Sequence, residues 1–263
     1  MSMLKLYGIL IRASIRSRMQ YKFNFIFSSL MAAFINVVEF LLVAILLDKF
    51  GNIKGWSLYE VGYLYSVLIL SKSIYRSLAS DVHHIERYLV SGEMDQLLIR
   101  PIPILLALMT QNFTIMLGEF LQGIIILVIS MQGLFAAGQI TVASIPLTVL
   151  IILSGAVVLF TIGLVSATMG FWITRVRDLQ NITEDASHTA ARYPLLIYPK
   201  WLQLLLVSIL PVGLVNYIPS LYILRGQYGL WVLVLTTALA AFALWLGLRF
   251  WRMGLSKYQS TGN

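Results

Sequence analysis

The chain has 263 residues, of which 59% are hydrophobic and only 11% are charged, and its mean hydropathy is +0.84. A soluble domain carries roughly 45–50% apolar and about 25% charged residues, so this composition indicates a polytopic membrane protein. The absence of cysteine excludes disulfides, thiolate metal sites and cysteine nucleophiles. The formal charge of +8 points to basic residues that flank membrane spans on the cytosolic side, and no nucleic-acid partner is expected.

Residues 1–22 form a basic amino-terminal segment. Its five cations precede an apolar run that is too long for a cleavable signal peptide. Lys5, Arg12 and Arg16 share one helical face, next to a face with Leu6. This pattern predicts a helix that lies in the membrane interface, and a basic tail without a further role is the alternative.

Five segments are long and apolar enough to cross about 30 Å of hydrocarbon. Thirteen Lys and Arg residues lie in alternate polar segments that include both ends of the chain. The positive-inside rule therefore predicts cytosolic termini and an even number of spans, most simply six, in one all-α membrane domain over residues 1–263. The five clear spans are Phe23–Leu47, Val61–Ser80, Ile104–Met131, Val142–Phe171 and Gly229–Phe250.

Residues 172–227 allow two positions for the remaining span. Either Leu195–Pro219 crosses the membrane, or Leu179–Tyr198 crosses as a polar helix and residues 200–227 are re-entrant. Four prolines between 194 and 219 favour broken helices. Polar residues here recur at steps of three and four, which predicts one stripe on a helix that lines a water-filled pathway or lies on the membrane surface. The stripe consists of Asp178, Asn181, Asp185, His188 and Arg192.

Residues 81–101 form the polar loop after the second predicted span. The loop has a helix-like start, a break at Ser91-Gly92, and a second short segment that begins with the acids Glu93 and Asp95. An apolar patch at residues 97–99 follows these acids. A short helix with an exposed apolar patch suits docking to a soluble partner, and an ordinary polar connector is the alternative.

The run from Ser91 to Pro103, SGEMDQLLIRPIP, closely resembles the SGELDxLLLRPxxP signature of the ABC-2 family of ABC exporter permeases. The similarity is to bacterial members with six spans and no fused ATPase. The segments Tyr193–Pro199 and Leu210–Pro219 look like a second pattern of the same family. The resemblance covers nearly the whole chain. One mild departure is Met94, which stands where the family more often has leucine.

The resemblance implies a permease that works with two copies of a cytosolic ATPase and with a second permease subunit, identical or different, in a bacterial plasma membrane. The ATPases would bind ATP and Mg²⁺ and push on a coupling helix in the first cytosolic loop, while this chain binds no cofactor. The resemblance also favours residues 179–198 as the fifth span. By matching positions, the residues that transmit the ATPase movement are Glu93, Asp95, Leu97, Leu98 and Arg100.

The remaining polar residues predict little catalytic chemistry. None of the seven lysines follows a glycine, so the chain has no P-loop and is expected not to be an enzyme. The neighbouring His83 and His84 point about 100° apart on a helix, so no metal site is predicted. Glu39 and Glu119 lie in predicted spans, where acids mark a polar cavity or a subunit interface. Together with Asp178, Asp185 and His188 of the polar stripe, they are the candidate residues of a substrate pathway.

Two other functions are compatible with the same residues. One is a membrane enzyme acting on lipid, with Glu184 beside Asp178, Asp185 and His188 as acid or base groups. The other is a membrane scaffold that transports nothing. For a transporter, a mostly apolar pathway with a few acids suits an amphiphilic or cationic substrate.

Overall fold

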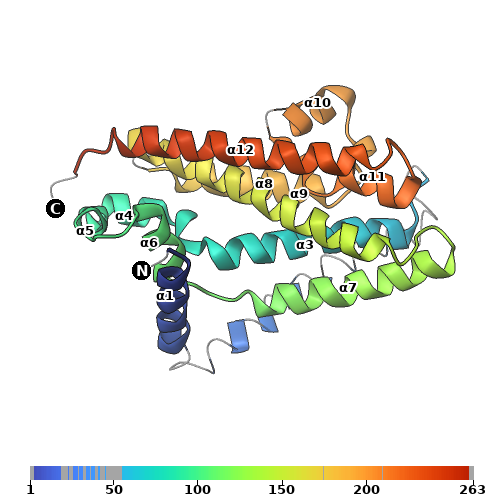
Figure 1. Ribbon diagram of the computed structural model, residues 1–263, viewed down its shortest axis with the longest axis horizontal. Helices are drawn as coiled ribbons and strands as arrows, with labels where there is room; N and C mark the ends of the chain where they lie inside the picture. The colour runs from blue at the N-terminus through green and yellow to red at the C-terminus, as the bar shows by residue number, and fades with distance from the viewer. Residues whose placement is uncertain are drawn as a thin grey trace.

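The computed structural model describes residues 3–18 and 55–260, except 174 and 209, together with scattered residues between 23 and 45. The first predicted span, Phe23–Leu47, therefore lies largely outside the described residues. The described part is helical and is built around four long helices that run side by side (Figure 1). These are α3 (Leu58–Leu78), α7 (Leu117–Ala136), α8 (Ser144–Ile173) and α12 (Trp231–Leu255).

Helix α3 is the centre of this bundle. It packs against α7 and α8, and α8 packs in turn against α12. At its first turn, Ser57 and Glu60 form a capping box, in which each side chain accepts a hydrogen bond from the other residue's backbone N–H. Small residues allow the close approach of α8. A Cβ on Gly163 would lie 2.4 Å from the hydroxyl of the buried Tyr75, so only glycine fits there without a rearrangement.

Three of the long helices, α7, α8 and α12, are long and apolar enough to cross a membrane. Helices α8 and α12 confirm the spans predicted at Val142–Phe171 and Gly229–Phe250. Helix α3 has 21 residues, a length of about 30 Å at ~1.5 Å per residue, but polar side chains lower its hydropathy.

The span predicted as one helix at Ile104–Met131 is wrong in its boundaries. The structure divides it into α6 (Ile104–Gln111) and α7, with a break at residues 112–116. The break is held by side chains from another segment, because the Asn112 amide donates to Asp81 (2.7 Å) and the Met116 backbone N–H donates to the Ser77 hydroxyl (3.0 Å). The break coincides with a polar interruption of the apolar run, which the prediction of a single span did not take into account, at Thr110, Gln111, Asn112 and Thr114.

Short helices cover one end of the bundle. They are η2 (Ser80–Val82), α4 (Ile85–Val90), α5 (Glu93–Leu98) and α6. Helix α1 (Met3–Arg18) packs against α6 at this end and runs crosswise to the long helices (Figure 1), an orientation that suits the predicted interfacial helix. Among the side chains described at positions 7–16 of α1, Ser14 is the buried one, and its hydroxyl donates to the backbone carbonyls of Gln111 and Phe113. The carboxyl end of α12 reaches the same end of the bundle (Figure 1).

The ambiguous region forms separate short helices rather than one continuous span over Leu195–Pro219. Helix α9 (Arg177–Ala191) packs against α8 and α3, and the Asn216 amide ties its last residue to α3 by donating to the carbonyls of Ala191 (2.7 Å) and Leu64 (3.0 Å). The segments Lys200–Ser208 and Pro211–Arg225 are bent by 70°, the geometry of a broken span or a re-entrant loop. The second segment contains η4 (Pro211–Leu214) and α11 (Tyr217–Arg225), while η3 (Leu195–Ile197) and α10 (Lys200–Ser208) precede them.

Candidate functional site

Helix α5 occupies the tip of the bundle, where the resemblance placed a coupling helix. Gly92 precedes it with a φ of 73°, a left-handed conformation that glycine adopts without strain. Glu93 and Asp95 lie in its first turn, where negative charge is favoured by the helix dipole. Met94 and Leu97 are fully buried and anchor the helix to the core. The helix is therefore held by one face and exposes the other.

The exposed face of α5 continues into the following turn and forms an apolar patch. Leu98 is 45% exposed and Ile99 is 85% exposed, and Val90 at the end of α4 is 43% exposed. Gln96 and Arg100 are also exposed. We call these five residues the coupling patch. A cluster of exposed aliphatic side chains with a polar rim is typical of a protein interaction site.

The two acids of α5 have different partners. Glu93 lies 3.5 Å from the Arg87 guanidinium in an exposed ion pair, which contributes little to stability. Asp95 instead accepts hydrogen bonds from the hydroxyls of Tyr258 (3.0 Å) and Ser260 (2.6 Å), so the carboxyl-terminal tail lies against α5. Burial, together with the hydrogen bond to the Asp95 carboxylate, raises the pKa of Tyr258 to about 12. Sequence reasoning missed this tail contact.

The loop that carries α5 is braced from within. The buried Asp81 carboxylate accepts hydrogen bonds from the Tyr88 hydroxyl and the Asn112 amide, both at 2.7 Å. Burial and the hydrogen bond to this carboxylate raise the pKa of Tyr88. His83 turns away from Asp81 and faces Glu184 of α9 at 3.0 Å. These side chains therefore serve the structure of the loop and do not converge on one site.

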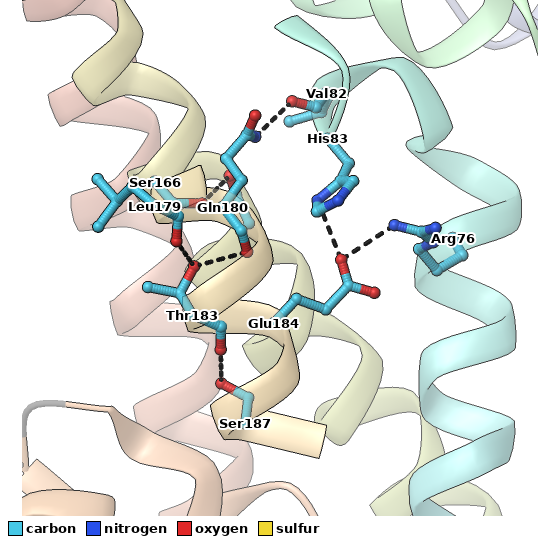
Figure 2. A network of polar contacts seen from close by, with 10 residues as sticks. Arg76, Val82, His83, Ser166, Leu179, Gln180, Thr183, Glu184 and Ser187 are labelled. Atoms are coloured by element: carbon cyan, nitrogen blue, oxygen red, sulfur yellow. Dashed lines mark hydrogen bonds and ion pairs between the residues drawn. The ribbon is translucent and has the colours of Figure 1, made fainter. Parts of the chain in front are cut away.

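Helix α9 turns a polar face toward this loop and the end of α3. Glu184 accepts from the Arg76 guanidinium (2.9 Å) and from His83, and the Gln180 amide donates to the Val82 carbonyl (3.1 Å), as Figure 2 shows. Neither Gln180 nor Glu184 belongs to the stripe predicted from the sequence. Gln180 was missed, and Glu184 was named only as an acid or base group for lipid chemistry, because the periodicity identifies a helix but does not say which of its polar faces is buried.

The predicted stripe itself is divided between two environments. Asp178, Asn181 and Asp185 are exposed on the outer surface of α9. His188 is buried and accepts hydrogen bonds from the Arg192 guanidinium through Nδ1. Of the four ionisable groups considered for lipid chemistry, Asp178 and Asp185 are exposed, whereas Glu184 and His188 line one small cavity, so the four do not form a shared acid and base site.

A small cavity of about 20 Å³ lies between α3, α8 and α9. That volume holds about one water molecule. The Gln180 Oε1 and His188 Nε2 atoms, from two lining residues, have no hydrogen-bond partner within the described part of the chain. The cavity is suited to a bridging water and is far too small for a substrate.

The two remaining candidate acids are placed differently. Glu119 lies in the first turn of α7, directly after the break, and not midway along one continuous helix. Its Oε2 atom is buried without a hydrogen-bond partner among the described residues. Glu39 lies outside the described residues. Neither acid is brought to the exposed face of α9 by the described structure.

A larger pocket of about 540 Å³ opens at the opposite end of the bundle, where α11 meets α12. Trp56 and Tyr217 line it and are buried, while Tyr228 and Trp231 line it and are more than half exposed. The Arg225 guanidinium lies 4.7 Å from the Trp56 ring centroid and pairs with the buried Glu60 at 2.8 Å. The sequence did not predict this pocket.

The chain was compared with known proteins. The model of the ABC-2 family of transporter proteins matches residues 33–262. The matched region includes every helix from α3 to α12, with α5 and α9 among them. The comparison with curated proteins finds no match.

Proposed function

Because the chain belongs to the ABC-2 family of transporter proteins, we propose that it is the membrane-spanning permease subunit of an ATP-driven exporter. The family and the apolar helices make it a multi-pass membrane transport protein. The finer proposal is that a separate cytosolic ATPase subunit, present in two copies, drives it. The observation that carries this proposal is the coupling patch on α5.

The architecture of α5 supports docking of a force-generating partner. Its buried residues, Met94 and Leu97, fix it to the bundle core, so a push on the exposed Leu98 and Ile99 is passed to the rest of the permease. A loosely attached connector would yield instead. The sequence offers no P-loop of its own, so ATP and Mg²⁺ would be bound by the partner.

The proposed topology places the α5 end of the bundle in the cytosol of a bacterial cell, with both termini on that side of the plasma membrane. Six spans result if residues 23–47, α3, α7, α8, α9 and α12 each cross. Helix α9 is the polar one, and its packing against α3 and α8 supports its role as the fifth span. The bent pair around Pro211 then forms the re-entrant region.

The exposed polar face of α9 is the proposed side of the substrate pathway. Asp178 and Asp185 would be costly against lipid, since a charged side chain costs up to about 2.5–3.5 kcal/mol at the bilayer centre, and Asn181 adds a polar group to the same face. A second permease subunit, either identical or different, would remove this cost by enclosing a water-filled path with that face. Two acids on the path suit a cationic or amphiphilic substrate.

The proposal is tested by purifying the tagged chain from its native host in mild detergent and in lipid discs, followed by mass spectrometry and an ATP hydrolysis assay. We expect a P-loop ATPase in a ratio of one per permease, and hydrolysis that vanadate inhibits. Recovery of the chain without an ATPase under both conditions would refute the proposal and favour the scaffold or the lipid enzyme. A second permease sequence in the sample would establish a heterodimer.

A further inference from the structure

Polar contacts from three positions of α9 join one of its faces to the carboxyl end of α3 and to the segment between α3 and α5. The Arg177 backbone N–H donates to the Glu86 carboxylate (2.5 Å), the Gln180 amide to the Val82 carbonyl (3.1 Å), and Glu184 accepts from Arg76 and His83. Positions 177, 180 and 184 are three and four residues apart, so they share one face of the helix. Figure 2 shows Gln180 and Glu184 reaching toward this segment. We call these contacts the clasp.

The clasp is built into the structure at both of its ends. Gln180 is 1% exposed, and the side chains of His83 and Glu184 are 10% and 19% exposed. With little access to water, Gln180 relies on the Val82 carbonyl for a hydrogen bond, and His83 and Glu184 rely on each other. At the other end, the Arg177 N–H is one of the donors that a helix leaves unpaired at its amino terminus. The Glu86 carboxylate satisfies it and complements the helix dipole.

The segment gripped by the clasp leads directly into the coupling patch. Glu86 lies on α4, and only Ser91 and Gly92 separate α4 from α5. Leu89 of α4 packs closely against the end of α8, where a Cβ on Gly170 would lie 2.8 Å from its side chain. A displacement of α5 therefore reaches the clasp across two residues of backbone.

Helices α3 and α9 are not equally free to respond. Helix α3 has fourteen buried residues among its 21 and is enclosed by α7 and α8, whereas α9 has five among its 15 and exposes a full face. An interior packed on all sides resists displacement more than a helix held from one side. The clasp thus connects the coupling patch to the less constrained of the two helices.

We propose that the clasp transmits the movement of α5 to α9. Glu86, Gln180 and Glu184 are then positioning residues, because they determine where the exposed face of α9 with Asp178 and Asp185 lies. This inference rests on the proposed function, because it requires an ATPase that moves α5. It adds that the pathway helix is moved through its buried polar face by contacts with the loop, while Arg76 ties the same face to the carboxyl end of α3.

The natural lack of cysteine allows a direct test in the assembled complex with its ATPase. One single-cysteine version, Gln96→Cys, reports on α5, and another, Asn181→Cys, reports on the exposed face of α9. The rate of labelling by a water-soluble maleimide is measured without nucleotide and after trapping with ATP and vanadate. In each version we expect the two states to differ by about fivefold, the lower range of ordinary coupling between sites.

The clasp is then opened by Glu184→Ala in both versions. The response is the logarithm of the ratio between the labelling rates in the two nucleotide states. We expect this response to remain at position 96 and to fall below about one fifth of its original value at position 181. Thr189→Ala, which truncates an exposed side chain of α9 outside the clasp and outside the proposed pathway residues, is the control and should keep both responses. Glu86→Ala opens the exposed end of the clasp and serves where Glu184→Ala fails to assemble.

The outcomes distinguish a failure of the clasp proposal from a failure of the proposed permease function. A full response at position 181 in Glu184→Ala, Glu86→Ala and the double variant would overturn the clasp while leaving the permease proposal intact. No response at position 96 in the original chain would instead contradict the proposed docking of an ATPase on α5. An equal loss in Thr189→Ala would also overturn the inference, since the effect would then not depend on the clasp.

Discussion

Ile99 provides the sharpest energetic prediction, because it is 85% exposed at the centre of the coupling patch. Burial of such a side chain by a partner would remove about 100 Å² of apolar surface from water, worth about 2.5 kcal/mol at ~25 cal/mol per Å². Ile99→Ala retains only a methyl group and should lose about 2 kcal/mol of this, which is about a 30-fold weaker complex. Ile99→Asp should weaken it further, because a carboxylate would be buried without a partner.

The assay is a titration of the purified ATPase onto the permease in lipid discs. The dissociation constant is measured by biolayer interferometry. Val142→Ala is the control, since Val142 is 74% exposed but lies in the loop before α8, at the opposite end of the bundle. Its dissociation constant should equal that of the original chain. Unchanged binding by both Ile99 variants would refute the placement of the interface on α5.

Three further predictions concern packing, the braced loop and titration. Gly155→Ala should lower the thermal midpoint by several degrees, because its Cβ would lie 2.7 Å from the Val215 backbone carbonyl and overpacking costs about 1–3 kcal/mol, whereas Gly8→Ala has open space and should not. Asn112→Ala removes a donor from the buried Asp81 carboxylate, so about 1–3 kcal/mol of stability should be lost and proteolysis of the loop should become faster. The pKa of Tyr258 is raised to about 12, so its contact with Asp95 stabilises the tail fully below pH ~10 and is lost as the pH rises toward 12. Tyr258→Phe should remove a tyrosinate step near pH 12 from the absorbance titration, and loss of a step near pH ~10 instead would contradict the contact.

The long apolar helices and α5 were predictable because their signals are local. An uninterrupted apolar run gives α8 its 30 residues, and the sequence Ser91-Gly92 followed by Glu93 and Asp95 marks the start of α5. The family signature fell on the same residues. In both cases the information lies within a window of a few helical turns.

The break before α7 could not be predicted in this way. Polar residues at 110–112 and 114 interrupt the apolar run, but the side chains that hold the break, Asp81 and Ser77, lie more than thirty residues earlier in the chain. A single sequence contains no signal for such a pairing. As a result, Glu119 was expected midway along a span and lies instead at the first turn of α7.

The polar contacts of the candidate site were missed for the same reason. Arg76 and Glu184 are 108 residues apart, and Asp95 and Tyr258 are 163 residues apart. The alternation of polar residues predicted helix α9 and the exposure of Asp178 and Asp185, but it grouped His188 with them. In the structure His188 is buried, because Arg192 and the neighbouring helices enclose it.

The central claim, that an ATPase docks on α5 and drives this permease, is tested most directly by cross-linking in native membranes. Ile99→Cys, in a chain without other cysteines, would carry a thiol-attached photoreactive probe, and Val142→Cys would carry the same probe at the other end of the bundle. The account predicts that peptides of a P-loop ATPase are linked to position 99 and not to position 142. Links from position 142 to the ATPase, or none from position 99 when the ATPase is bound, would contradict it.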